Sequence, residues 1–250
     1  MTAQQTAHGV DRTEYPETEP LGEDLLQRWI VELLRPLVER WIGDPEHVLV
    51  GADTFIYYEQ FDAKQRYAPD VYVMRGVPQD IAMGAWKTWE GHPAPAFALE
   101  VVAQRNWMKD YERVPRRCAA IGVGELVVFD PYFARRRKRP GARWQVFRRT
   151  PDGFTATLRS NEPQVWSDAL GCWLVATGEG QKTRLRLAAG DAAVIVPTPE
   201  EAERAAKEAE RAAKEAERTA KEAERAAKEA ALARIAELEA ELARRDRVKE

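Results

Sequence analysis

The chain is 250 residues long, 44% hydrophobic, and carries a formal net charge of −3. This length can bury one full-sized core, and the charge excludes a molecule that attracts nucleic acid through overall basicity. The sequence has no run of about 18 uncharged apolar residues, as a membrane-spanning helix needs. Its polar N-terminus also predicts no secretion signal.

Cysteine usage favours a reducing compartment. Cys118 and Cys172 are the two cysteines, and they lie far apart in the sequence. This setting suits buried thiols better than a disulfide framework. We therefore expect a cytoplasmic protein.

The N-terminal part divides into a polar lead-in and a helix. Residues 1–20 include Pro16 and Pro20, which predicts a flexible segment outside the fold. From residue 21, apolar side chains recur at steps of three and four residues, which predicts an amphipathic helix ended by Gly43-Asp44-Pro45. The apolar positions are Leu25, Trp29, Ile30, Leu33, Leu34, Leu37, Val38 and Trp41.

Five short runs rich in β-branched and aromatic residues predict strands, since each is bounded by Gly, Pro or Asp. The runs are residues 47–50, 54–58, 71–74, 97–102 and 126–129. Residues 108–121 lie between the last two and predict a helix, provided that Pro115 falls in its first turn. A strand, a helix and a strand in this order favour a parallel pairing with a right-handed crossover. The expected fold class is α/β, a mixed sheet flanked by helices.

The second half of the chain predicts a hairpin and then a separate tail. Residues 144–148 and 154–158 alternate around an Asp152-Gly153 turn, which favours a hairpin at one edge of the sheet. The segments around Trp166, 173–175 and 184–187 are too short to assign. From Pro199 the composition reduces to Ala, Glu, Lys and Arg, which cannot build a core. We therefore expect one domain over residues 21–197 and a helical tail over residues 198–250.

The tail is a sequence repeat. Residues 201–228 contain four seven-residue units, three of them EAERAAK and one EAERTAK. The spacing puts Glu within one helical turn of Lys or Arg, which predicts a helix. Its seam is alanine, and Ile235, Leu238 and Leu242 do not continue the phase of that seam. Because buried alanine contributes little, a lone solvated helix or a weak coiled coil is favoured over a strong zipper.

Two acidic residues stand in apolar strand sequence. Asp70 opens the strand in YAPDVYVM, and Glu100 lies inside FALEVVA. Burying an unpaired carboxylate costs on the order of several kcal/mol of folding free energy. Glu100 therefore needs a cation, a donor network or a metal as its partner. Two such carboxylates on adjacent strands would supply oxygen ligands for a magnesium ion. The alternative is that Asp70 caps a turn and Glu100 pairs with a core arginine.

Other catalytic arrangements have weaker support. Ser160 and Ser167 lie outside a nucleophile elbow, and His8, His47 and His92 lack metal-ligand spacing. The segment Gly122-Val123-Gly124 is too short for a dinucleotide loop and predicts a turn before a strand.

The segments YAPDVYVMRGVP, WKTWEG, PAFALEVV, KDY and IGVGELVVFDP, in this order, resemble the Uma-two family of restriction endonucleases, a branch of the PD-(D/E)XK nuclease superfamily. The resemblance covers roughly residues 21 to 190. It implies a core sheet flanked by helices, with Asp70 and Glu100 as ligands of Mg²⁺ or Mn²⁺. It also implies phosphodiester bonds in DNA as the target.

The chain departs from the superfamily pattern at the expected lysine. Val102 stands two residues after Glu100, and Val114 occupies the helix position from which many relatives supply a lysine instead. Lys109 is the nearest replacement and is the third catalytic candidate, with Arg113 one turn further along. The alternative is that Lys109 is a solvated residue beside an N-cap formed by Asp110.

Further polar residues could complete the site. Glu59 or Gln104 could add an acidic or polar group near the metal, and Glu32 of the first helix is a weak match to a polar residue of relatives. Asp130 is expected to cap a turn before Pro131. Eight basic residues without an acidic one lie between Pro131 and Pro151, so we expect either a phosphate-contacting loop or a solvated hairpin tip. The nucleic-acid-binding candidates among them are Arg135, Arg136, Arg137, Lys138 and Arg139.

Three functions follow from these observations. The first is a metal-dependent endonuclease acting on DNA. The second is a degenerate nuclease-like domain that binds nucleic acid or a protein partner. In the third, the tail drives assembly, for example into a homodimer.

Overall fold

The computed structural model describes residues 13–14, 25–81, 84–104, 107–135, 141–192 and 194–247, with side chains up to Glu239. Nearly all of the expected lead-in, residues 1–20, lies outside these ranges. The chain separates into two compact units, residues 1–196 and residues 197–250. We describe each unit by itself.

A six-stranded mixed sheet forms the centre of the first unit, in the order β1-β4-β6-β7-β8-β9. Strands β6 and β7 are parallel and are connected through α2, which confirms the predicted crossover pairing, and the remaining neighbours are antiparallel. The hairpin of β8 and β9 forms one edge, as expected. The strands are β1 (Val48–Gly51), β4 (Val71–Arg75), β6 (Phe97–Val101), β7 (Glu125–Phe129), β8 (Trp144–Thr150) and β9 (Gly153–Ser160).

One face of this sheet is covered by α1 (Leu25–Ile42) and by a four-stranded antiparallel sheet. The buried stripe of α1 includes Leu26, Ile30, Leu34 and Leu37, which matches the predicted amphipathic pattern. These side chains share one apolar core with both sheets. The three segments too short to assign from sequence supply most of the smaller sheet, as β10 (Gln164–Ser167), β11 (Cys172–Thr177) and β12 (Arg184–Ala189). Its fourth strand, β13 (Val194–Ile195), was not expected.

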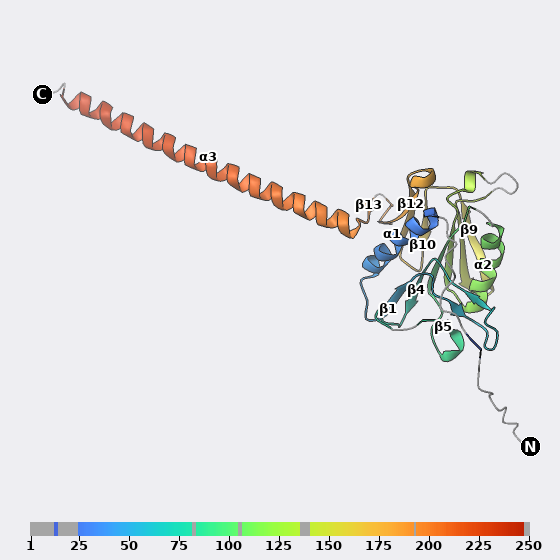
Figure 1. Cartoon of the computed structure of the whole chain (residues 1–250). Coiled ribbons are helices and arrows are strands. Elements are labelled where there is room, and N and C mark those ends of the chain that lie inside the picture. Colours follow the sequence, from blue (N-terminus) through green and yellow to red (C-terminus); the bar gives the residue numbers. More distant parts are fainter. Residues whose placement is uncertain are drawn as a thin grey trace, which may run out of the picture. The chain divides into compact units, whose positions relative to one another are not determined.

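The opposite face is covered by α2 (Met108–Ile121), as Figure 1 shows, and by a three-stranded sheet in the order β3-β2-β5. This small sheet contains β2 (Ile56–Tyr57), β3 (Arg66–Tyr67) and β5 (Trp86–Lys87). The strand expected over residues 54–58 is therefore only two residues long and does not join the central sheet. Short 3₁₀ turns at Thr88–Glu90, Phe133–Arg135 and Gly180–Lys182 complete the connections.

Helix α2 has the predicted bounds, but Pro115 lies inside it and not in its first turn. Gly122 ends the helix in the left-handed conformation, with φ of 97°, where a residue without a Cβ is strongly favoured. At Gly124, an added Cβ would lie 2.8 Å from the carbonyl oxygen of Ala96. The Gly122-Val123-Gly124 segment is thus the turn that brings β7 beside β6.

The second unit consists of α3 (Pro199–Arg247). Thr198 and Glu201 form a capping box at its start: the Thr198 hydroxyl accepts the Glu201 amide at 3.1 Å, and the Glu201 carboxylate accepts the Thr198 amide at 2.9 Å. From Glu203 to Glu239 every side chain is exposed. In the described part of the chain, no helix is both long enough and apolar enough to cross a membrane.

Candidate metal centre

Asp70 and Glu100 lie side by side on the α2 side of the sheet. The antiparallel register of β4 and β6 pairs Val71 with Leu99, and one further step places Asp70 opposite Glu100. Directly opposed residues of an antiparallel pair point to the same face. Their neighbours Tyr72 and Ala98 belong to the core beneath α2. The two carboxylates therefore share one face of the sheet.

Asp70 is held by two donors from different elements. Its side chain is 5% exposed. Nε2 of Gln27, on α1, donates to Oδ1 at 2.8 Å, and the backbone amide of Val101 donates to Oδ2 at 2.5 Å. Asp70 thus fixes the end of β6 rather than capping a turn. Each carboxylate oxygen can accept more than one bond.

Glu100 is buried among other acidic groups. It is 7% exposed, and the hydroxyl of Tyr67 donates to its Oε2. Burial raises the pKa of Glu100 well above its ordinary value, and the charges of Asp70 and Asp110 raise it further. The Tyr67 hydrogen bond and the charge of Lys109 act in the opposite direction. Among the described residues, the partner of Glu100 is a tyrosine hydroxyl and not the core arginine of the alternative interpretation.

Asp110 is a third buried carboxylate at this site. It is 1% exposed, and its Oδ2 accepts the backbone amide of Ala103 at 3.1 Å. The expectation that Asp110 caps α2 is wrong, because the helix begins at Met108 and Trp107 occupies the N-cap position. Asp110 instead ties the first turn of α2 to the segment that leaves β6.

Lys109 lies at the rim of the acidic cluster. Its Nζ is 3.9 Å from Oδ1 of Asp110, and its side chain is 55% exposed. Val102 and Val114, the two positions at which the sequence resemblance leads us to expect lysine, are buried in the apolar core beneath α2. Among positions 102, 109 and 114, only position 109 places a positively charged side chain at the site.

The remaining polar candidates are less closely associated with the cluster. Glu59 is exposed after β2, and its charge acts on the hydroxyl of Tyr58, whose pKa burial raises. Gln104 is exposed three residues beyond β6. Glu32 of α1 is also exposed and pairs with Arg28 at 2.9 Å.

The basic segment after β7 is only partly described. Arg135 is exposed at the end of a 3₁₀ turn, whereas Arg136, Arg137, Lys138 and Arg139 lie outside the described residues. Two other arginines of the segment bind within the domain. Arg148 pairs with Glu125 at 2.8 Å and with Asp168 at 2.9 Å. Arg149 donates to the carbonyl oxygens of Val123 and Ala119.

Asp130 behaves as the sequence indicates. It is fully buried and accepts the backbone amide of Tyr132 at 2.7 Å, which makes it the cap of the turn after β7. Its second oxygen accepts the hydroxyl of Tyr111, on α2, at 2.7 Å.

Sequence reasoning missed three residues of the site: Gln27, Tyr67 and Asp110 acting as an acidic partner of Glu100. A weak signal exists for Gln27, because it is a polar residue close to the apolar stripe of α1. Tyr67 carries no such signal, since its role depends on how β3 is placed over β6. For Asp110, the sequence indicates only a role as a helix cap.

The donor set fits a hard divalent cation. Among the described residues, no group of three or more His, Cys, Asp and Glu side chains is arranged to hold a metal. Mg²⁺ does not need such a cage, because it commonly binds through one or two carboxylates and keeps several waters. Two adjacent buried carboxylates whose charges destabilise each other are the kind of site that a dication would relieve.

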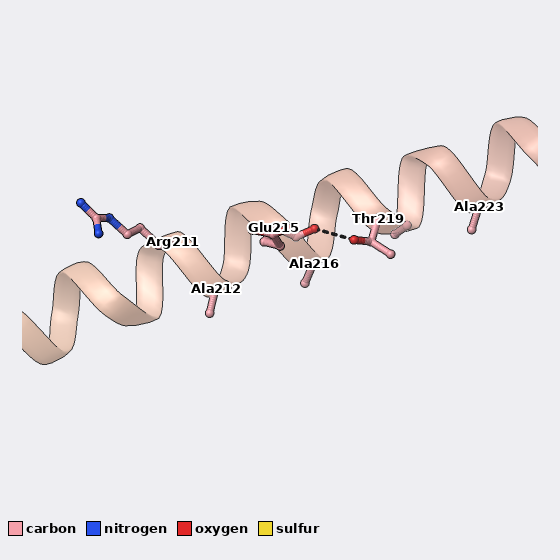
Figure 2. A pocket seen from close by; sticks show the side chains of 7 residues that line it. Arg211, Ala212, Glu215, Ala216, Thr219 and Ala223 are labelled. Carbon is pink, nitrogen blue, oxygen red and sulfur yellow. Dashed lines mark hydrogen bonds between the residues drawn. The ribbon is translucent and has the colours of Figure 1, made fainter.

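An open hollow along α3 is unrelated to this cluster. Figure 2 shows that the side chains around it all project from α3, so no second element closes it. Thr219 there donates to the backbone carbonyl of Glu215 at 3.0 Å. The lining residues are Arg211, Ala212, Glu215, Ala216, Thr219, Ala220 and Ala223.

The first unit is therefore a mixed sheet flanked by helices, with two buried carboxylates, Asp70 and Glu100, on adjacent strands. Residues 13–177 match the Uma2 family, described as "Putative restriction endonuclease", and the chain belongs to this family. A crystal structure described as "a putative nuclease belonging to DUF820" from Anabaena variabilis is similar, at 12% identity and a TM-score of 0.41. The match covers 62% of this chain and 77% of the other. No curated protein matches the sequence significantly.

Proposed function

We propose that this protein is a metal-dependent endonuclease that hydrolyses phosphodiester bonds in DNA. The observation that carries this proposal is the pair of buried carboxylates, Asp70 and Glu100, facing the same side of two adjacent strands. Membership of a family described as restriction endonucleases supports a nuclease. The metal requirement and the DNA substrate are parts of the proposal.

In this proposal, Asp70 and Glu100 hold Mg²⁺ or Mn²⁺. When bound, the ion supplies Lewis-acid activation of a phosphoryl oxygen and of the attacking water. Gln27 and the Val101 amide orient the carboxylate of Asp70, and Tyr67 orients that of Glu100. Lys109 extends from the same cluster toward solvent, where its ammonium group can neutralise charge that develops on the phosphate.

The outer residues would serve the nucleic acid. Gln104, exposed just beyond β6, is proposed to contact a phosphate or a water, and Glu59 is proposed as a second, more distant acidic group. Arg135 and the following Arg136, Arg137, Lys138 and Arg139 are proposed to bind the DNA backbone by charge. The two buried free cysteines, Cys118 and Cys172, fit a proposed cytoplasmic location.

A plasmid-cleavage assay with Mg²⁺ or Mn²⁺ tests the proposal by comparing the wild type with Glu100→Gln. Glutamine keeps the shape of the side chain and can still accept the Tyr67 hydrogen bond, but it removes a ligand charge. We expect cleavage to fall at least about 100-fold, since the ion contributes several kcal/mol to the transition state. The exposed Glu162→Gln is the matched control and should cut normally. Equal cutting by wild type and Glu100→Gln would rule out this site.

A second candidate is a nuclease-like domain that has lost catalysis and binds nucleic acid or a protein partner. The burial of Val102 and Val114 favours it, because neither position can place a cation near a phosphate. Under this alternative, the protein binds Mg²⁺ or Mn²⁺ in a manner that Asp70→Ala abolishes, yet it cuts neither plasmid nor oligonucleotide. Metal-dependent cleavage that requires Glu100 would exclude it.

A further inference from the structure

The solvent-facing side of α2 carries a row of cations that begins at the acidic cluster. Lys109, Arg113 and Arg116 are spaced by four and three residues, so they lie on one face of the helix. All three are exposed, whereas Val114 and Cys118 on the opposite face are buried. At about 1.5 Å of rise per residue, the row extends over about 10 Å.

Several cations on the other helices are neutralised by an acidic side chain one helical turn away. On α1, Arg28 pairs with Glu32 at 2.9 Å and Arg35 pairs with Glu39 at 3.0 Å. On α3, Lys207 pairs with Glu203 and Arg204 with Glu208 in the same way. Among the residues that the structure describes, Arg113 and Arg116 form no ion pair with an acidic side chain.

The position of the row ties it to the candidate site. Lys109, its first member, is 3.9 Å from Asp110 and acts electrostatically on Glu100. Glu112, the one exposed acidic residue of α2, is three residues from Lys109 and four from Arg116, so it borders the row on one side. A chain of phosphates passing the carboxylates could therefore continue along this face and meet positive charge at each helical turn.

We propose that the exposed face of α2, through Lys109, Arg113 and Arg116, is a docking surface for the phosphodiester backbone of the nucleic acid that enters the Asp70–Glu100 site. This inference rests on the proposed function and extends it, because it assigns backbone binding to α2 in addition to residues 135–139. The contacts are to phosphate, so they position the strand without reading its sequence.

The test measures binding separately from cleavage. A fluorescent DNA duplex and the matching single strand are titrated with full-length Glu100→Gln protein in the presence of a chelator, over a range of salt concentrations. The same titration follows with Arg113→Gln/Arg116→Gln added. We expect the slope of log K against log salt to become shallower by about two and the low-salt affinity to fall at least about tenfold. The DNA that binds more tightly, duplex or single strand, is the form that this surface prefers.

Arg40→Gln/Arg211→Gln removes the same number of exposed charges from α1 and α3 and is the matched control. With this control, the slope of log K against log salt should differ from that of the parent protein by less than about one. If the α2 variant behaves as this control does, or if the parent protein binds neither strand form, the docking surface is wrong. Wild-type cleavage is scored independently. If the wild type cleaves DNA but the α2 variant leaves the salt slope unchanged, only the proposed docking surface on α2 is wrong. If the slope becomes shallower but the wild type does not cleave DNA, the docking surface is supported and the nuclease proposal is wrong.

Discussion

Glu100 is buried, and its carboxylate accepts a hydrogen bond from the hydroxyl of Tyr67. The apolar residues around it are enough to predict that it is buried and needs a partner. The partner is Tyr67, 33 positions earlier, which reaches it from the two-residue strand β3. No spacing rule connects a strand that short to β6, so the predicted site contained the acidic pair but lacked the residues that orient it.

The burial of Glu100 predicts how stability changes with pH in metal-free protein. Its folded pKa is raised above the ordinary 4.5, so the folded state binds the proton more tightly than the unfolded state does. This contribution to stability is fully present below pH 4.5 and is lost as the pH rises toward the folded pKa. Glu100→Gln, which cannot ionise, should therefore be more stable than the wild type at pH 8, by at least about 1 kcal/mol.

Urea unfolding in chelator at pH 8 and below pH 4.5 measures this difference. The advantage of Glu100→Gln should shrink at the lower pH, where the glutamate is protonated in both states. Added Mg²⁺ should stabilise the wild type and not the variant, because ion binding favours the folded state. A variant less stable than the wild type at pH 8 without metal would contradict this description of Glu100.

At the scale of secondary-structure elements, the sequence predicts helices and strands best where the pattern of apolar residues is long. The stripe of α1 and the bounds of α2 were predicted, and the parallel β6–β7 pairing followed from the strand-helix-strand order. The small β3-β2-β5 sheet was missed, because pairings of two residues leave no periodicity to detect. Pro115 was placed wrongly: α2 tolerates it in the interior, where the buried Val114 and Cys118 hold the helix against the core.

Many charged residues of α3 pair with each other within the helix. Lys214 pairs with Glu210 at 2.6 Å and Lys221 with Glu217 at 2.5 Å, one helical turn apart, and the seam between them is alanine. Each such pair contributes only a few tenths of a kcal/mol, approximately 0.2–0.5, but none needs a second chain. This pattern favours the lone solvated helix over a coiled coil.

Deletion of residues 199–250 tests this interpretation. We expect analytical ultracentrifugation to give the same association state with and without the tail, because alanine burial offers little energy for a helix pair. Oligonucleotide binding should also be unchanged. A full-length dimer that becomes a monomer on truncation would instead show that α3 mediates assembly.

At the scale of the whole molecule, the proposed site depends on how the central sheet, α1, α2 and the small β3-β2-β5 sheet converge on two carboxylates from different β-strands. Asp70 is fixed from α1 through Gln27, Glu100 is fixed from β3 through Tyr67, and α2 closes the cluster with Lys109 and Asp110. The sequence order of the motifs could indicate the family. The convergence itself requires the fold.

Binding of Mn²⁺ to the full chain, followed by calorimetry, tests the central claim most directly. The wild type should bind one ion per chain. Asp70→Asn and Glu100→Gln should each weaken binding at least about tenfold while the protein stays folded, since each removes a ligand charge. If both variants bind Mn²⁺ as tightly as the wild type, the two carboxylates do not form a metal centre.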